Sequence, residues 1–298
     1  TIEGKRLLNV KEEKGVVLHK LDDVSTFEEG QEVRGKIDWN TRYSLMKNHT
    51  AAHLINWAAR KTLGQHVWQA GAKKAPKKAR LDITHFKTLS FDTLQEIEQI
   101  ANQKVQSSIE VEKRILPRTK AEETYGFRIY QGGAVPGKEL RIVKTGEEVE
   151  ACGGTHVDNT AEIGLIKITS SERIQDGVVR LEYVTDGKAF ETIQTHEQIL
   201  ESLSDLWDVP YEQLYKTGKR FFNEWKARGN KIDELENEII DLKVENALRE
   251  EKRLIKVEVP GSFGKIAERS KQYIPEIENA IILIGENYGY GVSANEVD

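Results

Sequence analysis

Two short segments, far apart in the chain, carry residue types that bind metal ions. His49 and His53 are four positions apart, and Cys152 and His156 repeat that spacing much later in the sequence. Residues four apart in a helix project from one face about one turn apart, so both imidazoles of the first segment can reach a single ion. One thiolate and three imidazoles form a ligand set that suits zinc. The two segments together predict a shared Zn²⁺ site.

Each segment alone has an ordinary explanation. Histidines four residues apart occur by chance in helices, and a lone cysteine is most often a small buried apolar residue. Cys152 is the only cysteine of the chain, however, and it lies in a turn with Gly153 and Gly154 rather than in an apolar run. The combination therefore favours a metal site over two unrelated features.

The composition restricts the class of protein. At 298 residues the chain exceeds a typical single core, so we expect two or three domains. A charged fraction of 31% with a net charge of −5 indicates a soluble protein in which any nucleic-acid contact is a local patch. A single cysteine fits a reducing compartment, and the chain has no apolar run of membrane-spanning length. We expect a cytoplasmic protein without membrane contact.

Periodicity predicts an α+β fold in four parts. Short strands at Gly15–Leu21 and Val33–Trp39 predict a small β-barrel-like unit in residues 1–40. An α/β-sandwich domain follows in residues 41–186, including a helix that carries His49 and His53 and ends at Gly64. Further strands are expected at Glu110–Leu116 and Leu140–Lys144, and Gly164–Thr169 and Val178–Val184 are expected to form a hairpin. Residues 187–255 are charge-dense and helical, which predicts a helical hairpin that serves as a dimerisation arm. Residues 256–298 look like the start of a further globular domain. The chain begins at Thr1 and ends soon after the strand-like Ala280–Ile284, so we expect part of a larger protein.

A basic run between Arg60 and Arg80 is the candidate nucleic-acid contact. It contains no acidic residue, and Trp68 within it offers an aromatic surface for stacking. The residues assigned to RNA contact are Lys73, Lys74, Lys77, Lys78 and Arg80. A solvated lysine loop explains the charges equally well.

Three stretches resemble the editing domain of alanyl-tRNA synthetases. They are Asp38–Leu54, Gln65–Gly71, and Cys152–His156 followed by Gly164–Ile166. A similar domain occurs in free-standing trans-editing proteins and, in related form, in threonyl-tRNA synthetases. The resemblance covers roughly residues 30–186. The stretch Arg220–Lys226 resembles the helical part that follows this domain in archaeal-type alanyl-tRNA synthetases, which favours a piece of the synthetase over a free-standing protein.

The resemblance implies hydrolysis of the ester that joins serine or glycine to tRNA(Ala), with His49, His53, Cys152 and His156 as zinc ligands. It also implies contact with the acceptor end of tRNA(Ala) and a homodimer formed through the helical and C-terminal parts. The sites for ATP and alanine would lie only in a preceding part of such a synthetase. The alternative is a zinc-stabilised module that binds tRNA and dimerises without hydrolysis.

Gln69 and Thr50 are the candidates for contact with the substrate. Each offers a donor and an acceptor close to the metal motif in sequence, and Gln69 corresponds to a glutamine near the site in the resembling family. For Thr50, an ordinary hydrogen bond is the alternative to contact with the substrate. The chain departs from many of the resembling proteins at Ala52 and Ala72, which carry no hydroxyl, and this puts the amino-acid preference in doubt.

Overall fold

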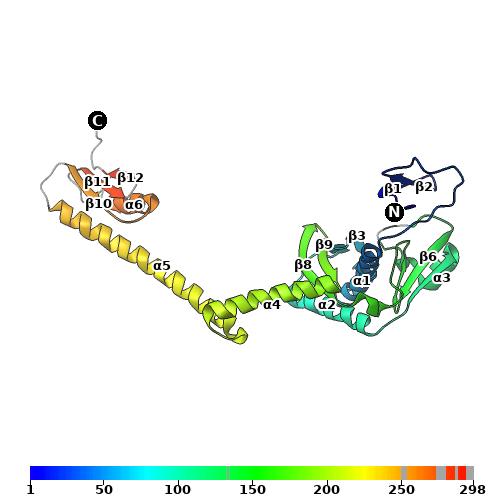
Figure 1. The fold of residues 1–298 in the computed structure, drawn as a ribbon. Coiled ribbons are helices and arrows are strands. Elements are labelled where there is room, and N and C mark those ends of the chain that lie inside the picture. Colours follow the sequence, from blue (N-terminus) through cyan, green and yellow to red (C-terminus); the bar gives the residue numbers. More distant parts are fainter. Residues whose placement is uncertain (132, 134, 250–253, 273–279, 286–287, 293–298) are drawn as a thin grey trace. The chain divides into compact units, whose positions relative to one another are not determined.

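The computed structural model describes residues 1–131, 133, 135–249, 254–272, 280–285 and 288–292 (Figure 1). The chain forms two compact units, Thr1–Gln198 and Ile199–Asp298. Both units combine helices with small sheets, which confirms the predicted α+β class. The division between the units falls within helix α4 (Gly187–Trp207), and the predicted boundaries after residues 40, 186 and 255 stay predictions.

The N-terminal part of the first unit is a β-hairpin. β1 (Leu7–Glu13) and β2 (Val16–Leu21) pair antiparallel. The sequence predicted β2, but it also predicted a strand at Val33–Trp39 that does not form. That segment is exposed throughout and contributes only an isolated bridge between Gly35 and Ile2. An apolar run without a buried face has no packing to hold it extended in a sheet.

The main core of the first unit lies between an antiparallel sheet and two helices. The strands follow the order β3 (Gln69–Lys74), β4 (Ala79–Thr84), β9 (Val178–Thr185) and β8 (Ile166–Gln175), and the sheet contacts α1 (Trp39–Leu63) and α2 (Phe91–Gln106). Leu54 and Ile55 of α1 are buried in one cluster with Leu81 and Leu181 of the sheet. The predicted hairpin of β8 and β9 is confirmed, with Gly177 at φ 72° in its turn.

A second, smaller sheet carries its own core. It consists of β5 (Val111–Pro117), β6 (Glu139–Thr145) and β7 (Glu148–Ala151), all antiparallel, and it packs with α3 (Arg118–Tyr125) and the single turn η1 (Phe127–Ile129). The single turn η2 (Thr160–Ile163) contacts α1 and α2 instead. The sequence predicted β5 and β6 but missed β7. Glu148 and Glu150 of β7 are both buried.

Helix α1 is the element that positions the candidate metal ligands. It begins where the side chain of Asp38 accepts a hydrogen bond from the backbone N–H of Thr41, a usual N-cap contact. It ends at Gly64, whose φ of 113° suits glycine, as the sequence predicted. Residues on every side of its middle turns are buried, polar residues included. The helix therefore runs through the core rather than over its surface.

The second unit contains most of the helical segment and the C-terminal sheet. α5 (Tyr211–Leu248) follows α4. The sheet consists of β10 (Leu254–Glu258), β11 (Ala280–Gly285) and β12 (Tyr288–Val292), and α6 (Phe263–Ser270) contacts it. Ile240 and Val244 of α5 are buried in one cluster with residues of this sheet. The predicted strand at Ala280–Ile284 is confirmed as β11. Residues 273–279, 286–287 and 293–298 of the predicted C-terminal domain, and 250–253 of the predicted arm, lie outside the described residues. Within the part of the chain that the structure describes, no helix combines the length and apolar character needed to cross a membrane.

Candidate metal centre

The four predicted metal ligands lie together in the first unit. The ligand atoms of His49, His53, Cys152 and His156 all lie within 4.8 Å of one another. Cys152 Sγ is 3.4 Å from His49 Nε2 and 3.4 Å from His156 Nε2. The first two residues come from α1, and the other two come from the turn that follows β7. The cluster therefore depends on packing α1 against the second sheet.

Arg141 of β6 holds the cysteine-bearing turn in place. Its Nη1 donates to the backbone oxygens of Cys152 at 2.7 Å and Gly154 at 2.8 Å, while the backbone N–H of Cys152 donates to Arg141 O at 2.9 Å. A charged donor that satisfies two carbonyl oxygens at once fixes the path of a turn. Nothing in the sequence indicates this role, because Arg141 lies in a strand with no motif around it.

Gly154 is required by the close approach of α1. A Cβ atom at this position would lie 2.0 Å from His49 Cε1 and 2.4 Å from His49 Nδ1, which is shorter than any tolerable contact. A Cβ atom on the neighbouring Gly153 would meet nothing within 4 Å. The turn therefore needs glycine at residue 154 to let His49 and Cys152 approach each other.

The hydroxyl of Thr50 contacts His156 and determines which of its ring nitrogens carries the proton. Its hydroxyl is fully buried and contacts Met46 O at 3.1 Å, Val157 N at 3.3 Å and His156 Nδ1 at 3.2 Å. A hydroxyl has one hydrogen and two acceptor sites. Donation to Met46 O leaves it to accept from Val157 N–H and His156 Nδ1–H, so His156 Nε2 keeps the lone pair that a metal requires.

Glu150 supports His53 in the same way. Its Oε2 lies 3.0 Å from His53 Nε2, and both side chains are buried. Asn56, one turn further along α1, donates to the other oxygen of Glu150 at 3.5 Å. A carboxylate on one ring nitrogen fixes the proton there and leaves the other nitrogen as the metal-binding atom. No motif in the sequence marks Glu150, which lies in β7 two residues before Cys152.

The electrostatics of the cluster keep its imidazoles neutral. Burial, the neighbouring histidine and Lys74 lower the pKa of His49 to about 3, and burial with Lys74 lowers the pKa of His53 to about 3. Burial also lowers the pKa of His156. Neutral imidazole is the form that binds metals. Burial raises the pKa of the Cys152 thiol, so its thiolate needs a nearby cation. Three imidazoles and one thiolate at these separations fit Zn²⁺.

Gln69 is tied to the same network through its backbone. It begins β3, and its N–H donates to Gln131 Oε1 at 3.2 Å. The same oxygen accepts from Asn56 Nδ2 at 3.1 Å. Because Asn56 also contacts Glu150, this network connects the start of β3 to the residue that supports His53. The side chain of Gln69 is half-buried, and its contact with a substrate stays a prediction.

The predicted basic loop is wrong as a single element. Arg60 and Lys61 belong to the last turn of α1, and the rest forms β3, β4 and the turn between them. Lys73 and Lys77 are exposed, whereas Lys78 pairs with Glu182 at 2.5 Å.

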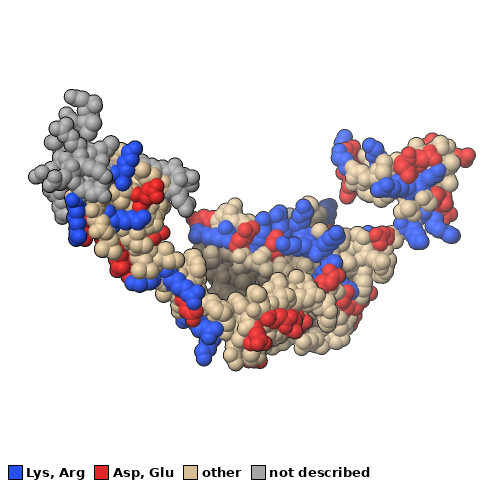
Figure 2. Space-filling model, turned by 60° about the vertical axis from the view of Figure 1, so that its left-hand side comes forward, with Lys and Arg blue, Asp and Glu red and all other residues tan. Residues whose placement is uncertain are grey.

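Lys74 and Arg80 are half-buried. Burial lowers the pKa of Lys74, while the charges of Cys152 and Glu150 oppose that shift, so Lys74 belongs to the surroundings of the metal cluster. Figure 2 shows Lys and Arg side chains gathered along the upper edge of the central body in that view, with a few Asp and Glu side chains among them.

Comparison with known proteins identifies a matching family and several relatives. Residues 140–182, which include the cysteine-bearing turn, match the family described as the threonyl and alanyl tRNA synthetase second additional domain. The chain thus carries a domain shared by those two classes of synthetase.

Alanine–tRNA ligases match almost the whole chain. The chain is 47% identical to the ligase of Methanocella arvoryzae over 98% of its own length and 34% of that protein. It is 47% identical to a ligase of Methanococcus maripaludis over 97% of its length and 32% of that protein. The ligase of Methanococcus vannielii is 49% identical over 81% of the chain and 27% of that protein. The chain is thus similar to one part of these alanine–tRNA ligases and spans about a third of their length.

The close approach at Gly154 gives a direct test of the metal centre. We expect the chain to retain about one zinc ion after dialysis, and Gly154→Ala to lose it because the added methyl group displaces His49. Gly153→Ala is the matched control and should keep its zinc. Metal content by mass spectrometry, with circular dichroism to verify folding, measures the difference. Equal zinc in the two folded variants would contradict this geometry.

Proposed function

We propose that the first unit contains a zinc-dependent site that hydrolyses seryl- and glycyl-tRNA(Ala), as the editing part of an enzyme that attaches alanine to tRNA(Ala). The observation that carries the proposal is the convergence of His49, His53, Cys152 and His156 from two distant segments. The similarity to alanine–tRNA ligases through 98% of the chain supports this source over a free-standing editing protein.

The reaction is the hydrolysis of one ester bond. The bond between the aminoacyl carbonyl carbon and the ribose oxygen breaks, water supplies hydroxyl to the carbonyl carbon, and the ribose oxygen takes up a proton. When bound, zinc would supply positive charge that orients the aminoacyl group and polarises its carbonyl. Thr50 and Glu150 hold the imidazoles, and Arg141 holds the turn that bears Cys152. These residues position the site, and none of them needs to touch the substrate.

A separate hydrolytic site is needed because a pocket for alanine rejects serine poorly. One added hydroxyl changes binding in a small pocket by only about a hundredfold. A second site that forms a hydrogen bond with this hydroxyl supplies further discrimination. Gln69 remains our candidate for that contact. The hydroxyl of Thr50 is already engaged by three partners and is fully buried, which favours a positioning role for it over contact with the substrate.

One observation favours a second candidate function. Four protein ligands form the closed set that is typical of structural zinc sites, whereas catalytic sites usually keep one position open. The chain would then be a zinc-stabilised module that binds tRNA and dimerises without hydrolysis. Ester hydrolysis by the zinc-loaded chain separates the two functions.

We expect the zinc-loaded chain to release serine from seryl-tRNA(Ala) faster than buffer does, and to leave alanyl-tRNA(Ala) largely intact. Cys152→Ala should lose this activity together with its zinc. Gln69→Ala should keep its zinc and hydrolyse seryl-tRNA(Ala) more slowly. Release of labelled amino acid measures each rate. Release no faster than in buffer, with zinc verified as bound, would leave only the structural module.

We further propose that exposed lysines at the β3–β4 turn bind the acceptor end of tRNA(Ala). Each phosphate contact contributes about 0.7–0.9 to the slope of log affinity against log salt. Lys73→Ala combined with Lys77→Ala should therefore weaken tRNA binding and reduce the slope by about 1.5. Lys120→Ala combined with Lys138→Ala, two exposed lysines of the second-sheet region, is the control. An unchanged slope in the first pair would assign these lysines to solvent.

We propose a homodimer through the helical and C-terminal parts of the chain. Ile232, Leu235, Ile239 and Leu242 of α5 are each more than 40% exposed, although their 3-4-3 spacing puts them on one helix face. An apolar stripe of this kind is typical of a contact with another helix. Sedimentation equilibrium should give twice the chain mass, and Leu235→Glu with Leu242→Glu should give the monomer. A monomer at all concentrations for the unaltered chain would refute the dimer.

A further inference from the structure

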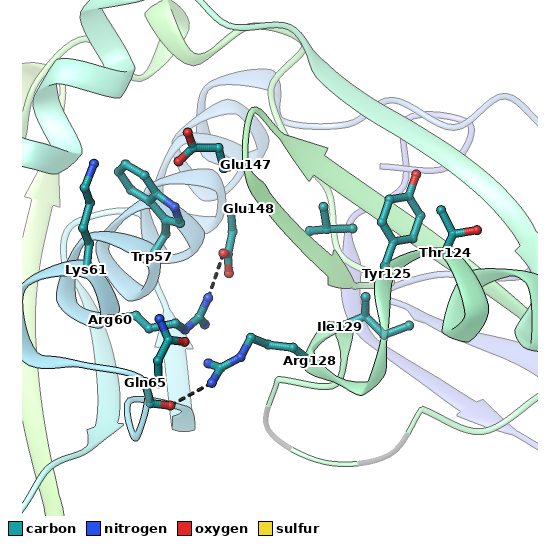
Figure 3. A pocket seen from close by; sticks show the side chains of 11 residues that line it. Trp57, Arg60, Lys61, Gln65, Thr124, Tyr125, Arg128, Ile129, Glu147 and Glu148 are labelled. Carbon is teal, nitrogen blue, oxygen red and sulfur yellow. Dashed lines mark hydrogen bonds and ion pairs between the residues drawn. The ribbon is translucent and has the colours of Figure 1, made fainter.

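A cavity in the first unit, separate from the metal cluster, has the features of a ligand-binding site. It has a volume of about 540 Å³, which is within the usual range for small-molecule sites. The end of α1, the α3–η1 segment and the start of β7 surround it (Figure 3). Trp57 and Tyr125 give it aromatic walls, and the charged residues Arg60, Arg128 and Glu148 face it.

Arg60 is a buried arginine with unused hydrogen-bonding capacity. Its side chain is only 8% exposed. Nη1 donates to Glu148 Oε2 at 2.9 Å, and Nε donates to Val67 O at 3.3 Å. Nη2 is buried and has no hydrogen-bond partner in the described part of the chain. A buried guanidinium N–H group without an acceptor destabilises the folded protein. A ligand that supplies an acceptor there would remove this cost.

Arg128 also lines the cavity and likewise has unused hydrogen-bonding capacity. Its Nη2 donates to Gln65 O at 2.8 Å, and its guanidinium lies over the Trp68 ring at 4.5 Å from the centroid. Its Nη1 is buried and likewise lacks a partner among the described residues. Burial and the positive charge of Arg60 both lower the pKa of Arg128. Two guanidinium groups of like charge thus line the same cavity, and each has a buried nitrogen without an acceptor among the described residues.

Glu148 is the acidic partner of Arg60 in this cavity. Its Oε2 accepts the hydrogen bond from Arg60 Nη1, and Oε1 is buried without a hydrogen-bond partner in the residues described. Lys61 and Glu147 add one charge of each sign to the lining. The two arginine nitrogens without acceptors are therefore the groups that a ligand in the cavity could satisfy.

We propose that this cavity binds the oxyanion group of a ligand, a phosphate or a carboxylate, between Arg60 and Arg128. An oxyanion supplies the acceptors that Nη2 of Arg60 and Nη1 of Arg128 lack. Charge-assisted bonds from two arginines are the usual way in which proteins bind such groups. The phosphate can come from a free small molecule or from the RNA backbone.

The test measures binding of inorganic phosphate to the complete, zinc-loaded chain by calorimetry, with chloride at matched ionic strength as the reference. We expect saturable binding that Arg128→Gln weakens by about tenfold or more. Arg114→Gln removes an exposed arginine of β5 and is the matched control. Arg128 is preferred over Arg60 for substitution because loss of the buried Arg60–Glu148 pair would disturb folding.

Each outcome decides the proposal. No saturable binding of phosphate or acetate by the unaltered chain would overturn it, as would equal affinity in folded Arg128→Gln. If tRNA displaces bound phosphate, the RNA backbone is the source of the oxyanion. If phosphate binds equally well to the tRNA-saturated chain, the ligand is a free small molecule. The measurement needs no ester hydrolysis, so its failure is distinct from a failure of the proposed editing activity.

Discussion

The packing of one face of α1 against the turn after β7 is the contact on which the first unit depends. It brings His49 and His53 to Cys152 and His156, and it requires glycine at residue 154 because the imidazole of His49 lies directly against the backbone of the turn. Arg141 and Thr50 are bonded to the same turn from opposite sides. If this contact were lost, the two segments would separate and the four ligand side chains would no longer lie together.

The same helix face continues as a buried polar stripe. His53, Asn56 and Arg60 follow one another at spacings of three and four, and they face Glu150 and Glu148 of β7. Buried charges and amides of this kind are tolerated only when their partners are in place. β7 supplies a carboxyl group for each end of the stripe, so one short strand serves both the metal centre and the arginine-lined cavity. The two sites therefore share their supporting residues without sharing their ligand-binding atoms.

Much of this arrangement was predictable from the sequence, because its signals are local. Two pairs of ligands at spacings of four and the glycine that ends α1 gave the candidate metal site and its helix correctly. β7 was missed because the carboxyl groups of Glu148 and Glu150 are compensated by Arg60 and His53, far away in the chain, and no local pattern records such pairing. The RNA contact of the basic run stays a prediction, but the sequence did not show how the fold divides its residues. Its charges are adjacent in sequence, but folding assigns Arg60 to a buried pair, Lys78 to Glu182 and Lys74 to the metal cluster.

The distance along the chain between the two halves of the metal cluster also bears on how the protein folds. His49 and Cys152 are 103 positions apart, and both sheets must form and dock before their side chains meet. Closing a loop of this length with a covalent cross-link reduces the entropy of the unfolded chain by an amount worth about 4–5 kcal/mol in the chain-entropy model. An ion bound by both segments would cross-link the chain and close a loop of the same length. Docking of the two segments and binding of the metal would then be one cooperative step.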